Sequence, residues 1–111
     1  MAVSNRRLIP ETMKSLAFGS IGASYVAIGT LSFPARLLII QNLTDKNMFF
    51  SFDGINDHLV LSATDRVILD ITGNSAFNEN FSIGKGTKIY VKQGAAPTTG
   101  SVYISSFHAA E

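Results

Sequence analysis

Apolar residues alternate with polar ones in several short runs of this chain, and glycine, asparagine, aspartate and serine separate the runs. Over residues 88–93 the alternation predicts that Ile89 and Val91 point inward. A period of two residues is typical of half-buried β-strands, whereas amphipathic helices repeat every three to four residues. The pattern therefore favours strands over helices, and further strands are expected at 12–18, 24–29, 59–61, 67–71, 81–83 and 101–108.

The rest of the chain is expected to be organised around its middle, residues 36–57. Residues 36–41 are mostly apolar and include two β-branched isoleucines, residues 48–52 are mostly aromatic, and turn-forming residues fill 42–47 between them. This arrangement predicts a β-hairpin that forms the central ribbon of the domain. Because both faces of 36–41 are apolar, that strand is expected to be buried on both sides.

The spacing of the expected strands indicates the fold class. There are about seven to nine of them at intervals of about 8–12 residues, which is typical of two packed antiparallel sheets. We therefore predict an all-β fold, a small antiparallel β-sandwich that is jelly-roll-like, in a single domain over 12–111. Residues 1–11 lack periodicity and Pro10 interrupts any strand there, so an extended N-terminal arm is expected. We expect Lys88 and Lys92 to guard one sheet edge and self-association to cover another.

Composition narrows the function classes. Only 15% of the residues are charged, whereas soluble domains usually carry about 25%. This deficit suggests that part of the surface is covered by copies of the chain or by a partner. The net charge of +1 provides no field that would attract nucleic acid or an anionic membrane. The chain has no cysteine and no apolar run near the ~20 residues of a membrane span, so neither disulfides nor membrane contact are expected.

Two polar loops offer candidate ligand sites. Residues 53–58, DGINDH, concentrate oxygen atoms that could hold Ca²⁺, but their spacing does not match an EF-hand loop and the same residues are common in turns. Residues 84–88, GKGTK, resemble part of a phosphate-binding loop without its upstream glycine or its following helix. We interpret both segments as turns, and no metal or cofactor is expected.

Histidines and tyrosines are the remaining chemical candidates. His58 and His108 could form a zinc pair or supply a catalytic base, but the local sequence pairs neither of them with a carboxylate and a nucleophile. No catalytic residue is therefore predicted. Tyr90 and Tyr103 occupy outward positions on strands that look adjacent, which predicts a cross-strand pair or an interface patch. A stacking platform for a sugar ring is the alternative.

The N-terminal arm completes the set of candidate contacts. Arg6 and Arg7 form a basic pair that is too short for a nucleic-acid-binding arm, and Leu8 and Ile9 follow directly. An arm that lies over a neighbour gains contacts that offset its ordering entropy. We therefore predict that a partner or a second copy is contacted by Arg6, Arg7, Leu8, Ile9, Tyr90 and Tyr103.

Three stretches of the chain resemble a known group of proteins. They are FGSIGASYVAIGTL (18–31), PARLLIIQNLTDKNMFFSFDGINDH (34–58) and IGKGTKIYVKQGAAPTTGSVYISSFHA (83–109). Together they look like small virion proteins of tailed bacteriophages, and more narrowly like the capsid decoration (stapling or cementing) protein of epsilon-type short-tailed Salmonella bacteriophages. The resemblance covers most of the chain from residue 18 onward, and its motifs are structural rather than catalytic.

This resemblance implies a structural protein without enzymatic activity. It would bind the outer surface of the phage capsid, bridge neighbouring major capsid subunits and reinforce the shell against internal DNA pressure. The implied partner is the major capsid protein, with homo-dimers or trimers at capsid symmetry axes and synthesis in the host cytoplasm. The alternative is a carbohydrate- or receptor-binding module of a phage tail or head surface, with Tyr90, Tyr103 and the 53–57 turn as its first candidates. A hydrolase that uses His58 or His108 is a third reading.

Overall fold

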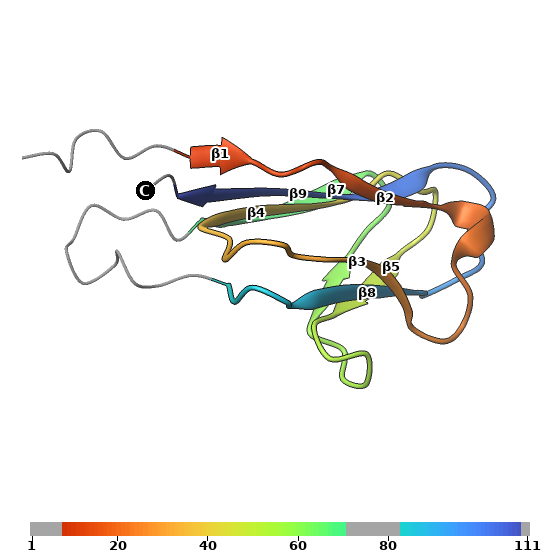
Figure 1. The fold of residues 1–111 in the computed structure, drawn as a ribbon. Coiled ribbons are helices and arrows are strands. Elements are labelled where there is room, and N and C mark those ends of the chain that lie inside the picture. The colour runs from red at the N-terminus through yellow and green to blue at the C-terminus, as the bar shows by residue number, and fades with distance from the viewer. Residues whose placement is uncertain (1–7, 71–82, 110–111) are drawn as a thin grey trace, which may run out of the picture.

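The computed structural model describes residues 8–70 and 83–109, and this part of the chain forms two antiparallel sheets packed face to face (Figure 1). Sheet A consists of β1 (Leu8–Pro10), β2 (Lys14–Ala17), β9 (Ser101–Ala109), β4 (Leu37–Asn42) and β7 (Asp65–Asp70). Sheet B consists of β3 (Val26–Thr30), β8 (Lys88–Gln93), β5 (Met48–Ser51) and β6 (Leu59–Leu61). A single turn of 3-10 helix, Phe18–Ser20, follows β2. The predicted all-β sandwich is confirmed.

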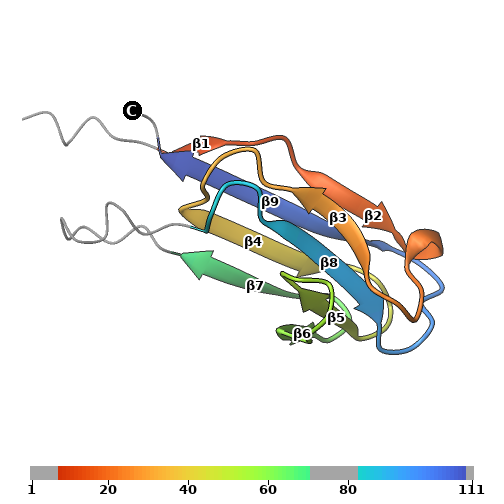
Figure 2. The ribbon, with the colours of Figure 1, turned by 60° about the horizontal axis from the view of Figure 1, so that its bottom comes forward.

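The strand order is that of a jelly roll. Sheet A has the order β2-β9-β4-β7, with β1 pairing farther along the same edge of β9, and sheet B has the order β3-β8-β5-β6 (Figure 2). All of these pairings are antiparallel. Most consecutive strands lie in opposite sheets, so the chain winds around the core as it does in two-sheet jelly rolls.

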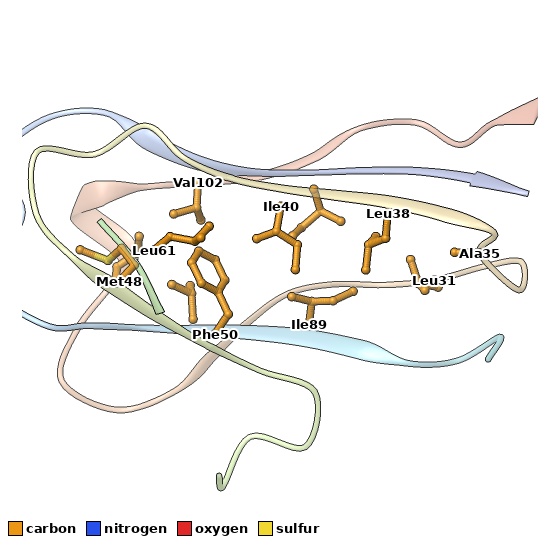
Figure 3. Close-up of a cluster of buried hydrophobic side chains, with 12 residues drawn as sticks. Leu31, Ala35, Leu38, Ile40, Met48, Phe50, Leu61, Ile89 and Val102 are labelled. Carbon is orange, nitrogen blue, oxygen red and sulfur yellow. The ribbon is translucent and has the colours of Figure 1, made fainter. Parts of the chain in front are cut away.

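The core lies between the sheets and receives alternate residues from the strands of each (Figure 3). Ile89 and Val91 of β8 are fully buried, as the alternation predicted. Phe50 of β5 is the largest fully buried side chain, and burial of such a side chain contributes about 1.5–3 kcal/mol. The other buried apolar residues are Ile21, Leu31, Ala35, Leu38, Ile40, Met48, Leu61, Val102 and Ile104.

The predicted central hairpin is wrong, because β4 and β5 lie in different sheets. β4 pairs with β7 and β9, whereas β5 pairs with β6 and β8. The connection between β4 and β5 therefore crosses from one sheet to the other instead of reversing within one sheet. Turn-forming residues serve both kinds of connection, so the local sequence did not distinguish them.

A buried asparagine occupies the corner where the chain crosses. The side chain of Asn42 is fully buried, and its Nδ2 donates to the backbone carbonyls of Lys46, Leu61 and Ser62 at 2.9, 3.1 and 3.0 Å. Its Oδ1 accepts the backbone N–H and the hydroxyl of Thr44 at 3.0 and 2.6 Å. One amide thus connects β4, the crossing segment and the end of β6.

The loop before β9 packs against the same corner. Gly100 has a φ of +91°, and a Cβ there would lie 2.0 Å from the backbone oxygen of Leu43. Only glycine fits this approach of two backbones. The carboxylate of Asp45 accepts the N–H and the hydroxyl of Thr98 at 2.9 and 2.5 Å, and these bonds lower the pKa of Asp45.

The N-terminal boundary differs from the prediction, because residues 8–10 form β1 rather than part of an extended arm. β1 pairs antiparallel with β9, with Leu8 opposite Ala109 and Pro10 opposite Phe107. Proline is tolerated there because β1 is an edge strand, where a missing N–H need not break a ladder. The rest of the predicted arm, including Arg6 and Arg7, lies outside the described residues.

Glu11 connects the chain after β1 to the loop after β3. Its backbone N–H donates to the carbonyl of Ser106 at 2.9 Å. Its carboxylate accepts the N–H groups of Ser32 and Phe33 and forms an ion pair with Lys14, each at 3.2 Å. Burial raises the pKa of Glu11, but the hydrogen bonds from Ser32, Lys14 and Phe33 outweigh it, so the pKa lies below its usual value.

Two smaller expectations also change. β8 lies between β3 and β5, so Lys88 and Lys92 do not guard an edge. Of the strand expected at 81–83, Ile83 makes an isolated bridge with Ala35, and the first two residues lie outside the described part of the chain.

Candidate interaction surfaces

The outer face of sheet A carries a continuous apolar patch. Leu37 of β4 lies opposite Phe107 of β9, which in turn lies opposite Pro10 of β1. One step along the same face, Ile39 of β4 lies opposite Ile68 of β7. We define the sheet-A patch as Leu8, Pro10, Leu37, Ile39, Ile68, Tyr103 and Phe107. None of these side chains is charged.

The sheet-A patch is partly exposed, which corrects the expectation that β4 is buried on both sides. On the inner face Leu38 and Ile40 are fully buried, but on the outer face Leu37 and Ile39 are not. Ile68 is 51% exposed, and no described segment lies over this face (Figure 1). Apolar sheet faces of this kind mark sites of protein contact. The two apolar faces of 36–41 signalled this patch, although their pattern alone was interpreted as burial.

Tyr90 and Tyr103 do not form the predicted pair. Tyr90 lies on β8 in sheet B, whereas Tyr103 lies on β9 in sheet A. Their side chains point to opposite sides of the sandwich, so the two rings share no stacking platform. Tyr103 belongs to the sheet-A patch. Tyr90 is close to the 53–57 loop, because a Cβ added at Gly54 would lie 3.2 Å from the tyrosine ring.

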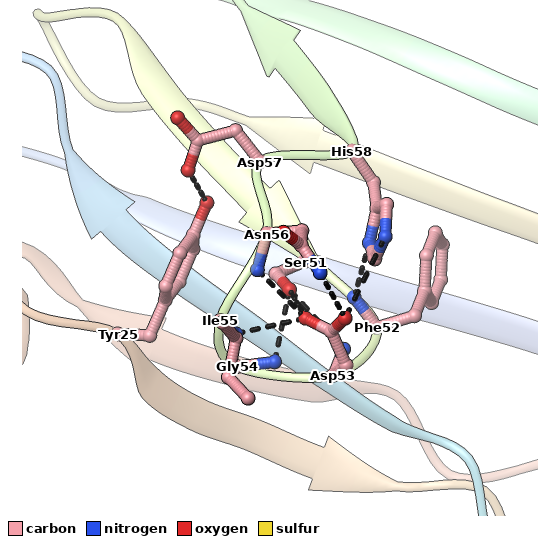
Figure 4. A network of polar contacts seen from close by, with 9 residues as sticks. All are labelled: Tyr25, Ser51, Phe52, Asp53, Gly54, Ile55, Asn56, Asp57 and His58. Atoms are coloured by element: carbon pink, nitrogen blue, oxygen red, sulfur yellow. Dashed lines mark hydrogen bonds and ion pairs between the residues drawn. The ribbon is translucent and has the colours of Figure 1, made fainter.

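Residues 51–58 form a closed polar turn against sheet B (Figure 4). Oδ1 of Asp53 accepts the N–H groups of Ile55 and Asn56 at 2.8 and 2.9 Å, and the hydroxyl of Ser51 at 2.8 Å. Oδ2 accepts the side-chain amide of Asn56 at 2.8 Å. Bonds from Asn56, Ile55 and Ser51 hold the pKa of Asp53 well below its usual value. Both oxygens are engaged by donors, which supports the interpretation of this segment as a turn.

A cluster of Tyr25, Asp57 and Lys92 holds this turn against sheet B. The hydroxyl of Tyr25 donates to Oδ1 of Asp57, and the Lys92 ammonium lies 3.0 Å from the same oxygen. The ammonium also lies 4.8 Å from the centroid of the Tyr25 ring. Burial, the hydrogen bond to Asp57 and its negative charge raise the pKa of Tyr25 above the usual range. The bonds from Tyr25 and Lys92 lower the pKa of Asp57.

Each histidine contacts a phenylalanine, and Nε2 of His58 also lies 3.9 Å from Oδ2 of Asp53. Nδ1 of His58 accepts the N–H of Phe52 at 3.0 Å, and the two rings stack with centroids 5.7 Å apart. His108 stacks on Phe33 with a centroid distance of 4.1 Å. Over residues 8–70 and 83–109, no group of three His, Cys, Asp or Glu side chains could hold a metal. The same residues include no helix that is long and apolar enough to cross a membrane.

An open hollow of about 330 Å³ lies beside β5. The Phe49 ring lines it, with Lys92 Nζ 5.6 Å from the ring centroid. The other lining residues are Asp45, Lys46, Asn47, Gly94 and Ala95. Sequence reasoning missed this hollow because its two sides come from the crossing segment and from the loop before β9, which no local pattern connects.

Comparisons with known proteins assign neither a family nor a function to this chain. No protein-family model and no curated protein matches the chain. Among solved structures, a chain from Bacillus endospore appendages, described as a novel family of disulfide-linked pili, matches with a TM-score of 0.49 and 10% identity. The match covers 100% of this chain and 96% of that chain. A likeness at this level assigns no function to this protein.

Proposed function

We propose that this chain is a non-enzymatic structural virion protein on the outer surface of a phage capsid. It binds the major capsid protein, bridges neighbouring subunits and reinforces the shell against the pressure of packaged DNA. The sheet-A patch is the observation that supports this proposal, because a group of partly exposed apolar side chains on a sheet face suits another protein surface. The identity of the partner comes from the resemblance of three stretches of the chain to phage decoration proteins.

Many copies of such a bridging protein, each making weak contacts, can together stabilise a shell. A standard interface covers about 800 Å² on each partner, which is more than a few exposed side chains supply. A copy that contacts two subunits gains effective concentration for its second contact, and copies repeated over a lattice add their contributions. Weak contacts through one sheet face are therefore sufficient for a stable coat.

Co-sedimentation with phage shells that lack the protein tests this proposal. The wild-type chain is expected to bind saturably at a fixed ratio and to make the shells harder to disrupt by heat. Ile39→Lys places a charge in the sheet-A patch and is expected to weaken binding about tenfold or more. Val60→Lys is the matched control, because Val60 is 55% exposed on β6 of the other sheet. Absence of wild-type binding, or equal binding of both variants, would refute the proposal.

The hollow beside Phe49 favours a second candidate, a carbohydrate- or receptor-binding module. Sugar rings stack on aromatic faces and are oriented by a few polar groups, which Lys46 and Asn47 could provide here. A glycan array tests this candidate. Hits that disappear in Phe49→Ala but persist in Tyr90→Ala would support the hollow as the site. An array without hits, or hits that Phe49→Ala leaves unchanged, would exclude it.

A further inference from the structure

β7 forms one edge of sheet A. On one side it pairs with β4, from Asp65 opposite Asn42 to Asp70 opposite Leu37. On its other side no described strand pairs with it (Figure 2). β7 is six residues long, whereas β3 and β6, the two edge strands of sheet B, have five and three residues. A long unpaired edge offers a template to another strand.

The alternation of backbone hydrogen bonds in sheet A shows which residues of β7 direct their N–H and C=O groups toward β4. The N–H of Leu43 donates to the carbonyl of Ser101 at 2.9 Å, in register with the β4–β9 ladder. Antiparallel strands alternate between residues that bond to one neighbour and residues that bond to the other. The odd-numbered residues of β4 therefore bond to β9 and the even-numbered ones to β7. Their partners in β7 include Val67 and Leu69.

The alternate residues of β7 consequently direct their backbone groups toward the side of β7 on which no described strand lies. These residues are Arg66, Ile68 and Asp70. The N–H of Arg66 accordingly donates to the Asp65 carboxylate at 2.8 Å instead of to β4. The side chains of Arg66, Ile68 and Asp70 share the outer face of sheet A, because Ile68 lies opposite Ile39 and the other two are two residues away.

The sequence of this edge, Asp-Arg-Val-Ile-Leu-Asp, is complementary to itself in antiparallel register. If two copies meet at a two-fold axis through Ile68, Ile68 lies opposite its own copy and Val67 lies opposite Leu69. Arg66 then lies opposite Asp70, once on each side of the axis. Opposite charges on directly opposed residues stabilise strand pairs, and like charges destabilise them. A shift of two residues in either direction loses both ion pairs.

We infer that β7 pairs with β7 of a second copy in this register and forms a homodimer with one continuous sheet A. Antiparallel pairing places opposed side chains on the same side of a sheet. The sheet-A patches of the two copies therefore lie on one face of the joined sheet, on both sides of Ile68. This pairing needs no capsid, so the purified chain tests it independently of the proposed function.

Charge reversal at the edge is the first test. In sedimentation velocity and light scattering at micromolar concentration, the wild-type chain is expected to have twice its monomer mass of 11.9 kDa. Arg66→Asp opposes carboxylates, Asp70→Arg opposes cations, and each is expected to weaken the dimer about tenfold or more. The double variant restores both pairs, so its dimer should match the wild type within about threefold. An equimolar mixture of the two single variants should form a heterodimer, because one copy then carries two carboxylates and the other two cations.

Two lysine variants test whether the edge at β7, rather than another surface, forms the dimer interface. Ile68→Lys places like charges at the two-fold axis and should give monomers, whereas Val60→Lys on β6 should leave the dimer intact. Circular dichroism and urea unfolding establish that each variant is folded. A monomeric wild type, single charge variants that dimerise normally, a mixture without heterodimers, or equal effects of both lysines would overturn the inference. A normal dimer that fails to bind shells would refute the proposed function and leave this inference intact.

Discussion

The buried corner at Asn42 allows a quantitative prediction for Asn42→Ala. The truncation removes the donor to three backbone carbonyls and the acceptor for both polar groups of Thr44. Some of these groups have second partners. The carbonyl of Lys46 also accepts the Thr44 hydroxyl, and the carbonyl of Ser62 also accepts the N–H of Asp65. The N–H of Thr44 loses its acceptor in a buried site, which costs about 1–3 kcal/mol, and the remaining bonds add about 1 kcal/mol net.

The expected loss for Asn42→Ala is therefore about 2–4 kcal/mol, a large share of the ~5–15 kcal/mol that stabilises a domain. Urea unfolding followed by circular dichroism measures it, with Gln41→Ala on the outer face as control, for which a change within about 0.5 kcal/mol is expected. A loss below about 1 kcal/mol in Asn42→Ala would refute the role given to this amide.

Asn42→Asp distinguishes lost hydrogen bonds from lost volume. The new carboxylate would face the carbonyls of Lys46, Leu61 and Ser62, which raises its pKa in the folded state above the unfolded value. Its cost is therefore smallest below the unfolded pKa and grows as the pH rises through the folded pKa. The stability difference from the wild type should be larger near pH 7 than near pH 4 for Asn42→Asp, but the same at both for Asn42→Ala. Equal pH dependence in the two variants would contradict this account.

Three further predictions follow from the geometry. Gly100→Ala should lower the free energy of unfolding by about 3 kcal/mol or more, because the new Cβ would clash with the backbone. Gly86→Ala, with a φ of +88° and open space around it, should lower it by only about 1–2 kcal/mol. Equal losses of the two variants in urea unfolding would contradict this. The pKa of Glu11 is lowered on folding, so its stabilising effect is present above the unfolded value near 4.5 and is lost as the pH falls; Glu11→Gln should remove this part of the acid sensitivity, and a wild-type–variant difference constant with pH would refute it. In an alkaline absorbance titration, the difference between wild type and Tyr25→Phe should show that Tyr25 ionises with a pKa above the ordinary tyrosine range. Asp57→Asn removes a negative charge beside Tyr25 and should lower this pKa. An unchanged pKa would contradict the role given to Asp57.

The strands themselves could be predicted because alternation in the sequence reflects burial on one side of a strand. The inward positions Ile89 and Val91 of β8 depend only on neighbours along the chain, and so do Val102 and Ile104 of β9. Pairing between strands is not local. Asn42 shows why the hairpin prediction failed, since its carbonyl partners at the end of β6 lie 19 and 20 residues away.

The candidate surface could be predicted only in part for the same reason. Tyr90 and Tyr103 each lie on an outward position, as expected, but the sequence does not state that their strands belong to different sheets. Pro10 suggested the end of ordered structure, whereas an edge position beside β9 accommodates it. The open edge at Ile68 becomes recognisable only when β7 is known to end the sheet.

The position of β9 has a consequence for how the protein is made. β9 is the last strand of the described chain, yet it lies between β2 and β4 in sheet A. Until β9 has been synthesised, β2 and β4 lack the strand that pairs with both of them. Sheets built from such distant pairs fold slowly, and exposed apolar strands aggregate during the delay. Sheet A can therefore be completed only after residues 101–109 have left the ribosome and inserted between strands made earlier.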